Sequence, residues 1–265
     1  MRGKHWLIAA MVWAGVAGCR GDRPIEEIAR LGAARASGTF ARYAVASDHR
    51  IASLAGAAML ERGGNAIDAA VATSFALSVV RPYSCGIGGG GFMVIRFADG
   101  RAMAFDYREI APAAVGRDYY INKPEDASTR GGTAVGVPGT VAGLLEIHER
   151  FGRLDRATVL APAIDAATRG FVVDGHYISS TRSLVTWYRE DTSRQARFAF
   201  VWDRFLKRGN VREGDLIQLP EQAEALRLIA RDGARAFYEG EIAQEMLRVI
   251  SEDGGPMTAD DLRQQ

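Results

Sequence analysis

Two short stretches of the chain carry residue types that could bind or process a small molecule. The stretch from Arg81 to Phe92 reads R-P-Y-S-C-G-I-G-G-G-G-F and contains a G-x-G-x-x-G pattern that begins at Gly86. The stretch from Asp106 to Pro112 reads D-Y-R-E-I-A-P. Glycine-rich backbone can bring N–H groups close to a phosphate, and the planar guanidinium of Arg108 can bind a carboxylate through two parallel hydrogen bonds. The elements around each stretch decide which chemistry is available.

The segment before the glycines predicts a helix, which is the wrong order for a dinucleotide site. Residues 65–80 are rich in alanine, apolar on nearly every side and free of glycine and proline, as in a buried helix. Asn65 is a good N-cap, and Asp68 places a carboxylate in the first turn, where the helix dipole favours it. A dinucleotide fingerprint follows a strand and opens a helix, and a Walker loop needs Lys-Ser or Lys-Thr after Gly91. Both phosphate-binding interpretations are therefore rejected.

The segments after the glycines predict a β-hairpin. Residues 92–98 are rich in β-branched and aromatic side chains, a second strand is expected over residues 101–107, and Asp99-Gly100 between them is typical of a type I′ turn. Asp106 lies 20 residues after Gly86, but it ends a hairpin rather than a second parallel strand. The glycine run thus joins a helix to a hairpin, where it allows positive φ angles and close approach of the main chain.

Further elements are predicted on both sides of this region. A short strand is expected at 43–47 and helices at 51–62 and 156–169, and a second glycine-rich passage at 131–140 leads into a helix that ends near 151. Residues 112–130 are expected to be irregular. Amphipathic helices follow from Pro220 onward.

Composition bounds the class of protein. A chain of 265 residues with 48% hydrophobic content can hold one large domain or two small ones. With 33 basic and 32 acidic residues, the net charge is +1 and no long run of one sign occurs, so no nucleic-acid partner is expected.

The histidines give no support for a metal site. There are four, without an H-x-x-x-H or C-x-x-C pattern, so neither a metal nor a cofactor is expected, and His148 is expected on the surface of a helix. Ser47, Asp48 and His49 are the residue types of a hydrolase triad. Adjacent residues on an extended chain point to opposite faces, however, so hydrogen bonding at a turn or strand end is the better interpretation.

The first 18 residues resemble a bacterial lipoprotein signal. Arg2 and Lys4 form a basic start, residues 6–15 are apolar, and Val16-Ala17-Gly18 precedes Cys19, which would become the lipidated first residue of the mature chain. An ordinary cleaved signal and a short buried helix are the alternatives.

The lipoprotein interpretation has three consequences. Residues 19–42 become a tether, Cys85 is left without a disulfide partner, and the chain is attached to a membrane by acyl groups rather than spanning it. The expected location is the periplasm or the cell surface.

Several blocks together resemble the large-subunit half of the γ-glutamyltranspeptidase family. They are R-G-G-N-A-I-D-A-A-V-A at 62–72, S-C-G-I-G-G-G-G-F at 84–92, D-Y-R-E-I-A-P at 106–112, G-V-P-G-T-V-A-G-L at 136–144, G-D-L-I-Q-L-P-E-Q-A at 214–223, A-F-Y-E-G-E-I-A at 236–243 and G-G-P-M-T-A-D-D-L at 254–262. The blocks occur in the family's order and define a family region at 43–265.

The resemblance implies an α+β fold, part of the αββα sandwich of N-terminal-nucleophile hydrolases, incomplete in this chain. In that family the precursor cuts itself, and the new N-terminal Thr attacks the γ-glutamyl amide of glutathione or a similar donor, with its own α-amine as base. Arg108 matches the family's carboxylate-binding Arg, whereas composition alone favours a surface Arg paired with a nearby acid. Glu109 is expected to orient Arg108.

The glycines are expected to form the wall of this site. Gly86, Gly88, Gly89 and Gly90 would let the backbone turn tightly beside Arg108.

The family's T-T-H context of the nucleophile occurs nowhere in residues 1–265. We therefore expect no catalytic residue in this chain, no turnover by the chain alone, and dependence on a small-subunit-like C-terminal half. Unpaired sheet edges, an exposed apolar face and poor solubility are expected without that half. The alternatives are a noncatalytic γ-glutamyl-binding lipoprotein and a fragment of a related β-lactam acylase.

Overall fold

The computed structural model describes residues 39–264. The predictions for the 1–18 signal, for Cys19 and for most of the 19–42 tether lie outside the described residues. No helix within 39–264 has the length and apolar character needed to cross a membrane.

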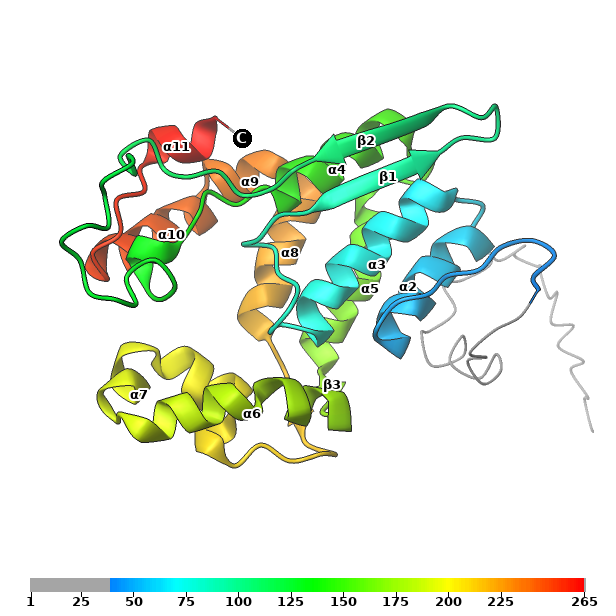
Figure 1. Ribbon diagram of the computed structural model, residues 1–265. Coiled ribbons are helices and arrows are strands. Elements are labelled where there is room, and N and C mark those ends of the chain that lie inside the picture. Colours follow the sequence, from blue (N-terminus) through cyan, green and yellow to red (C-terminus); the bar gives the residue numbers. More distant parts are fainter. Residues whose placement is uncertain (1–38, 265) are drawn as a thin grey trace, which may run out of the picture.

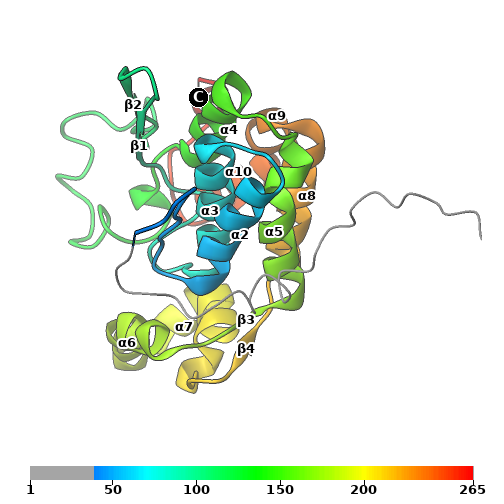
Figure 2. The ribbon, with the colours of Figure 1, turned by 90° about the vertical axis from the view of Figure 1, so that its right-hand side faces the viewer.

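Four helices pack side by side and form the main body. They are α2 (Arg50–Glu61), α3 (Ala66–Val80), α5 (Arg156–Arg169) and α8 (Pro220–Asp232). Figures 1 and 2 show them running roughly alongside one another. The helices expected at 51–62, 65–80 and 156–169 are confirmed within a residue or two.

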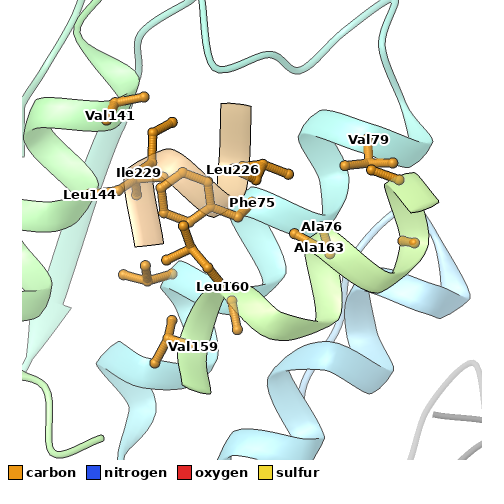
Figure 3. Close-up of a cluster of buried hydrophobic side chains, with 14 of the residues drawn as sticks. Phe75, Ala76, Val79, Val141, Leu144, Val159, Leu160, Ala163, Leu226 and Ile229 are labelled. Atoms are coloured by element: carbon orange, nitrogen blue, oxygen red, sulfur yellow. The ribbon is translucent and has the colours of Figure 1, made fainter. Parts of the chain in front are cut away.

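Helix α3 lies at the centre of this body because it is apolar on nearly every side. Phe75 is fully buried and packs among residues of three other helices, including Leu160 of α5 and Leu226 and Ile229 of α8 (Figure 3). Burial of one such aromatic side chain contributes about 1.5–3 kcal/mol. The Ala-rich sequence lets neighbouring helices approach α3 on several sides, and α3 thereby fixes the point at which the glycine run begins.

The expected hairpin follows the glycine run. Strand β1 (Phe92–Arg96) pairs antiparallel with β2 (Ala102–Asp106), so that Phe92 lies opposite Asp106. Ile95 is buried, whereas Phe92 and Val94 on the other face are 63% and 76% exposed. Within the described residues neither strand has a second neighbour. The predicted unpaired edges and exposed apolar face are therefore confirmed.

The type I′ turn predicted at Asp99-Gly100 is wrong. A type I′ turn needs positive φ at both central residues, but Gly100 has φ 91° while Asp99 does not have a positive φ. Phe97 N donates to Arg101 O, which closes a three-residue loop instead. The carboxylate of Asp99 accepts a hydrogen bond from Arg101 N at 3.0 Å, and this bond supports the observed turn.

The strand predicted at Tyr43 to Ser47 is also wrong. These residues form no strand, and none of the described strands pairs with them. Val45 instead packs on α2, where it comes so close to Gly56 that a Cβ there would lie 2.9 Å from Val45 Cγ1. Strand propensity has no effect here because no partner strand lies alongside.

Four further helices lie at one end of the main body. They are α4 (Thr140–Phe151), α9 (Ala234–Tyr238), α10 (Glu241–Glu252) and α11 (Ala259–Arg263). The Tyr238 hydroxyl donates to Pro138 O at 2.9 Å and accepts from Ala142 N at 3.2 Å. Tyr238 thus anchors the start of α4, which borders the glycine run. Residues 112–130 contain no helix or strand, as predicted.

A separate arm, residues 173–215, extends from a two-stranded stem. The stem pairs β3 (Phe171–Val172) with β4 (Leu216–Ile217), and the arm contains α6 (Gly175–Glu190), α7 (Ser193–Arg197), the π-helix η2 (Val201–Phe205) and the short 3-10 helix η3 (Lys207–Gly209). It lies below the main body in Figure 1. The arm has its own apolar cluster of Tyr188, Trp202 and Leu206.

Asp68 connects the start of α3 to the end of α4. Its carboxylate is fully buried and accepts hydrogen bonds from the backbone N–H groups of Asn65, Arg153 and Leu154. His148 Nε2 lies 3.1 Å from Asp68 Oδ1. The expectation that His148 is a surface residue is wrong, since it is 7% exposed. Burial alone would raise the pKa of the Asp68 carboxyl. The backbone hydrogen bonds and His148 lower this pKa by more, so it lies below the ordinary value for an aspartate.

Asp68→Asn is expected to destabilise the protein by about 3 kcal/mol at pH 7, because an amide cannot replace a carboxylate among several N–H donors. The folded-state pKa is depressed, so this contribution is present above pH 4 and is lost on acidification. Urea unfolding at pH 7 and at pH 3 measures both effects. Asp165→Asn, which removes an exposed pair with Arg169, is the matched control and should change stability by less than about 0.5 kcal/mol. An Asp68→Asn midpoint equal to that of the control would contradict this account.

Candidate functional site

Two glycine-rich passages enclose the segment that carries Arg108. On one side, Tyr107 N donates to Gly91 O at 3.0 Å and Gly91 N donates to Tyr107 O at 3.3 Å, so the hairpin ladder continues into the glycine run. On the other side, Ile110 and Val137 exchange backbone hydrogen bonds of 3.3 and 2.8 Å. The main chain on either side of Arg108 is therefore fixed by backbone contacts.

The approach between these segments is too close for any side chain. A Cβ on Gly90 would lie 2.6 Å from Tyr107 O and 2.8 Å from Arg108 Cα. A Cβ on Gly139 would lie 2.1 Å from Tyr107 O, and one on Gly143 would lie 2.3 Å from Tyr107 Cβ. These positions require glycine for close approach of the backbone rather than for phosphate binding.

The start of α4 holds the middle of the glycine run. Gly89 O accepts hydrogen bonds from both Gly139 N and Thr140 N, each at 2.9 Å. The first N–H groups of a helix have no partner within the helix, and here a backbone carbonyl satisfies them. The run is thereby fixed at its centre as well as at its end.

Arg108 lies on the exposed side of this arrangement. Its side chain is 61% exposed, Nε donates to Glu109 Oε2 at 3.1 Å, and the guanidinium carbon is 5.7 Å from the centroid of the exposed Phe92 ring. Arg108 N donates to Asp106 Oδ1 at 2.9 Å. Nη1 and Nη2 have no hydrogen-bond partner within residues 39–264, so this edge of the guanidinium can take a carboxylate. The pairing with Glu109 also matches the simple interpretation of a surface Arg next to an acid.

A cavity of 240 Å³ lies beside the glycine run. Tyr107 and Glu109 line the cavity, whereas Arg108 does not line it but donates from Nε to Glu109 Oε2. The other lining residues are Ser74, Leu77, Ser84, Cys85, Gly86, Gly89, Gly90, Thr140 and Leu144. Three of the four predicted wall glycines thus line a cavity, Gly88 does not, and Arg108 faces the exposed side of the hairpin.

Other candidate residues have structural partners. Ser47 Oγ donates to His49 O, and His49 Nδ1 accepts from Ile51 N as the N-cap of α2, which agrees with the local hydrogen bonding that was preferred over a triad. Cys85 is a free thiol, and the described residues contain no cluster of side chains suited to a metal ion.

Sequence reasoning missed Arg81, which is only 3% exposed. Its guanidinium binds Asp48 and Asp174, and this pairing is the main reason that the pKa of Asp174 is lowered to about 2. The partners lie 33 and 93 positions away in sequence. The available signal was an arginine directly after a mostly apolar helix.

Comparison with known proteins identifies relatives of most of the described region. The model of the family described as Gamma-glutamyltranspeptidase matches residues 52–265. A "Glutathione hydrolase proenzyme" of Pseudomonas sp. (strain A14) is 38% identical over 225 residues, which are 83% of this chain and 38% of that protein. The chain therefore spans little more than a third of the length of this relative.

Solved structures agree with the sequence comparison. A γ-glutamyltranspeptidase from Pseudomonas nitroreducens superposes with a TM-score of 0.77 at 38% identity, covering 86% of this chain and 66% of that chain. A cephalosporin acylase from Bacillus halodurans gives a TM-score of 0.71 at 30% identity, covering 80% of this chain and 40% of that chain. The predicted α+β fold of an N-terminal-nucleophile hydrolase is thus confirmed for the part that is covered.

Gly90→Ala is expected to lower the free energy of unfolding by about 1–3 kcal/mol, because the new methyl group overlaps the backbone of Tyr107 and Arg108. Gly88→Ala is the matched control, since a Cβ there meets nothing within 4 Å. It should be neutral or stabilise by a few tenths of a kcal/mol. Thermal and urea unfolding of both variants measure the difference, and equal effects would argue against the close approach.

Proposed function

Because the chain belongs to the γ-glutamyltranspeptidase family, we propose that residues 39–264 supply the carboxylate-binding side of a site for γ-glutamyl compounds such as glutathione. The observation that supports this most directly is the geometry of Arg108. Its Cα is held between two glycine passages, while Nη1 and Nη2 face the exposed side without a protein partner among the described residues. A planar fork fixed in this way suits the α-carboxylate of a γ-glutamyl group.

Glu109 acts as the partner that orients Arg108. Its Oε2 accepts from Arg108 Nε at 3.1 Å, which leaves the outer edge of the guanidinium free for a ligand. The glycines from Gly86 to Gly90 support the backbone behind Arg108 and do not contact the ligand in this proposal. Their role is to exclude side chains from the space that the main chain occupies.

The nucleophile belongs to a C-terminal half in this proposal. The sequence T-T-H does not occur in residues 1–265, and resemblance to the family places the nucleophilic Thr at the start of a small subunit. The exposed apolar face of the hairpin, with Phe92 at 63% and Val94 at 76% exposure, supports a partner that covers it. The substrate would lie between Arg108 and that partner, and the chain alone would release no glutamate from a γ-glutamyl anilide.

A β-lactam acylase is the second candidate, favoured by the similarity to the cephalosporin acylase. A glutaryl side chain retains a carboxylate but lacks the α-amino group of a γ-glutamyl compound. Parallel titrations with glutathione and with a glutaryl amide separate the two, because only a γ-glutamyl site discriminates for the amino group. A noncatalytic γ-glutamyl-binding lipoprotein would bind glutathione equally but stay inactive with any C-terminal half.

Export is proposed from residues 1–19. The basic start, the apolar stretch and the small residues before Cys19 support a lipid-anchored, exported chain. The mass of the mature chain tests this, since acylation at Cys19 adds fatty acids that Cys19→Ala cannot carry.

Arg108→Ala is expected to weaken glutathione binding, measured by calorimetry. In the chain alone, where Arg108 is exposed, its ion pair with the glutathione carboxylate contributes about 0.2–1 kcal/mol, or up to fivefold in Kd. With a C-terminal half in place, a charge-assisted hydrogen bond contributes about 1.5–3 kcal/mol, or roughly 10- to 150-fold.

Two controls make this measurement specific. Arg101→Ala removes another exposed hairpin arginine, paired with Asp99, and should leave the affinity unchanged. A glutathione ester that neutralises the γ-glutamyl carboxylate should bind the wild type more weakly but Arg108→Ala no differently. Equal loss of ester binding by both proteins would count against the assignment of Arg108.

A further inference from the structure

Arg81 joins three helix ends at the point where the glycine run begins. It directly follows α3, and it binds Asp48 beside the N-cap of α2 and Asp174, the N-cap of α6. With 3% exposure, Arg81 is one of the few buried charged residues of the described chain. Burial of a guanidinium is costly unless its N–H groups are paired, so this arrangement is specified rather than incidental.

The planar guanidinium of Arg81 binds one aspartate along each of two edges. Nη1 and Nη2 donate to the two carboxylate oxygens of Asp174 at 3.1 and 2.7 Å, and Nε and Nη2 donate to Asp48 Oδ1 and Asp48 O at 2.7 and 3.0 Å. A lysine ammonium is a point charge without this planar geometry, and it cannot make the four contacts together.

The backbone of Arg81 begins the glycine run. Its carbonyl oxygen accepts from Ser84 N at 3.0 Å and from Cys85 N at 2.9 Å. The other end of the run is held by the paired hydrogen bonds between Gly91 and Tyr107. Arg81 therefore fixes one end of the run, and the segment next to Arg108 fixes the other.

We infer that Arg81 is a positioning residue for the carboxylate-binding site, acting through the glycine run on Arg108. The inference rests on the proposed function of Arg108. Its physical basis is the contact of Gly90 with Arg108 Cα, where a Cβ would lie only 2.8 Å away, so displacement of the run displaces Arg108. Through Asp174, the same guanidinium makes the base of the arm part of the support for the site.

Two variants test this, each chosen to preserve the local fold. Arg81→Lys keeps the charge and loses the fork. Asp174→Asn keeps a good N-cap for α6 and removes the charge. The controls are Arg248→Lys, which alters an exposed arginine bound to Glu245 and Glu252, and Ile229→Val, which lowers global stability from within the core.

Hydrogen exchange of individual amides and calorimetry with glutathione are measured on the full chain. In Arg81→Lys and Asp174→Asn we expect the amides of Cys85, Gly91 and Tyr107 to exchange at least tenfold faster, with Kd for glutathione raised by up to the factor measured for Arg108→Ala. In the double variant both effects should be close to those of Arg81→Lys alone, because the two residues act through one contact. Arg248→Lys should change neither quantity, and Ile229→Val should leave Kd unchanged.

The outcomes separate the inference from the proposed function. Faster exchange in the run with unchanged Kd overturns the inference and leaves the role of Arg108 intact. Unchanged exchange in the run also overturns it. Additive effects in the double variant, or a rise in Kd for Ile229→Val that matches its loss of stability, would reduce Arg81 to a general structural residue. A wild-type chain whose glutathione affinity equals that of Arg108→Ala overturns the proposed function itself, whatever the exchange data show.

Discussion

Close contact between main-chain segments is the constraint on which the rest of the site depends. The backbone from Tyr107 to Ile110 is bound by the glycine run on one side and by the passage before α4 on the other. Such contact requires the absence of side chains, since a single Cβ at Gly90 or Gly139 would overlap backbone atoms. Two helices position this contact. Helix α3 ends where the glycine run begins, and the first N–H groups of α4 donate to the carbonyl of Gly89.

The same segment borders both a cavity and the exposed face of the hairpin. The extended segment sends Glu109 toward a cavity of 240 Å³ and Arg108 toward the exposed face of the hairpin. Gly86, Gly89 and Gly90 line this cavity, whereas Arg108 does not. Arg108 nevertheless stays next to the cavity, because its Nε donates to Glu109 Oε2 and Glu109 lines the cavity.

Local signals in the sequence predicted the elements that local interactions determine. Asn65 and Asp68 predicted the start of α3 correctly, because both partners of this capping box lie within four residues of one another. The order of helix, glycine run and hairpin followed in the same way. The position of His148 and the pairing of Arg81 depended on partners 80 and 93 residues away, and no periodicity or propensity reports such contacts. The type I′ turn predicted at Asp99-Gly100 was wrong. The hydrogen bond from Arg101 N to the Asp99 carboxylate supports a different turn from the one that the Asp-Gly dipeptide favours.

The exposure of Arg108 has a thermodynamic consequence for assembly. In open solvent a guanidinium and a carboxylate gain little from pairing, because water screens both. A polypeptide that covers Phe92 and Val94 would remove that water and strengthen the ion pair. By linkage, a ligand that binds better to the covered state must tighten the association of the covering polypeptide by the same factor. The ligand would thus help to hold the two halves together, and loss of ligand would favour their separation.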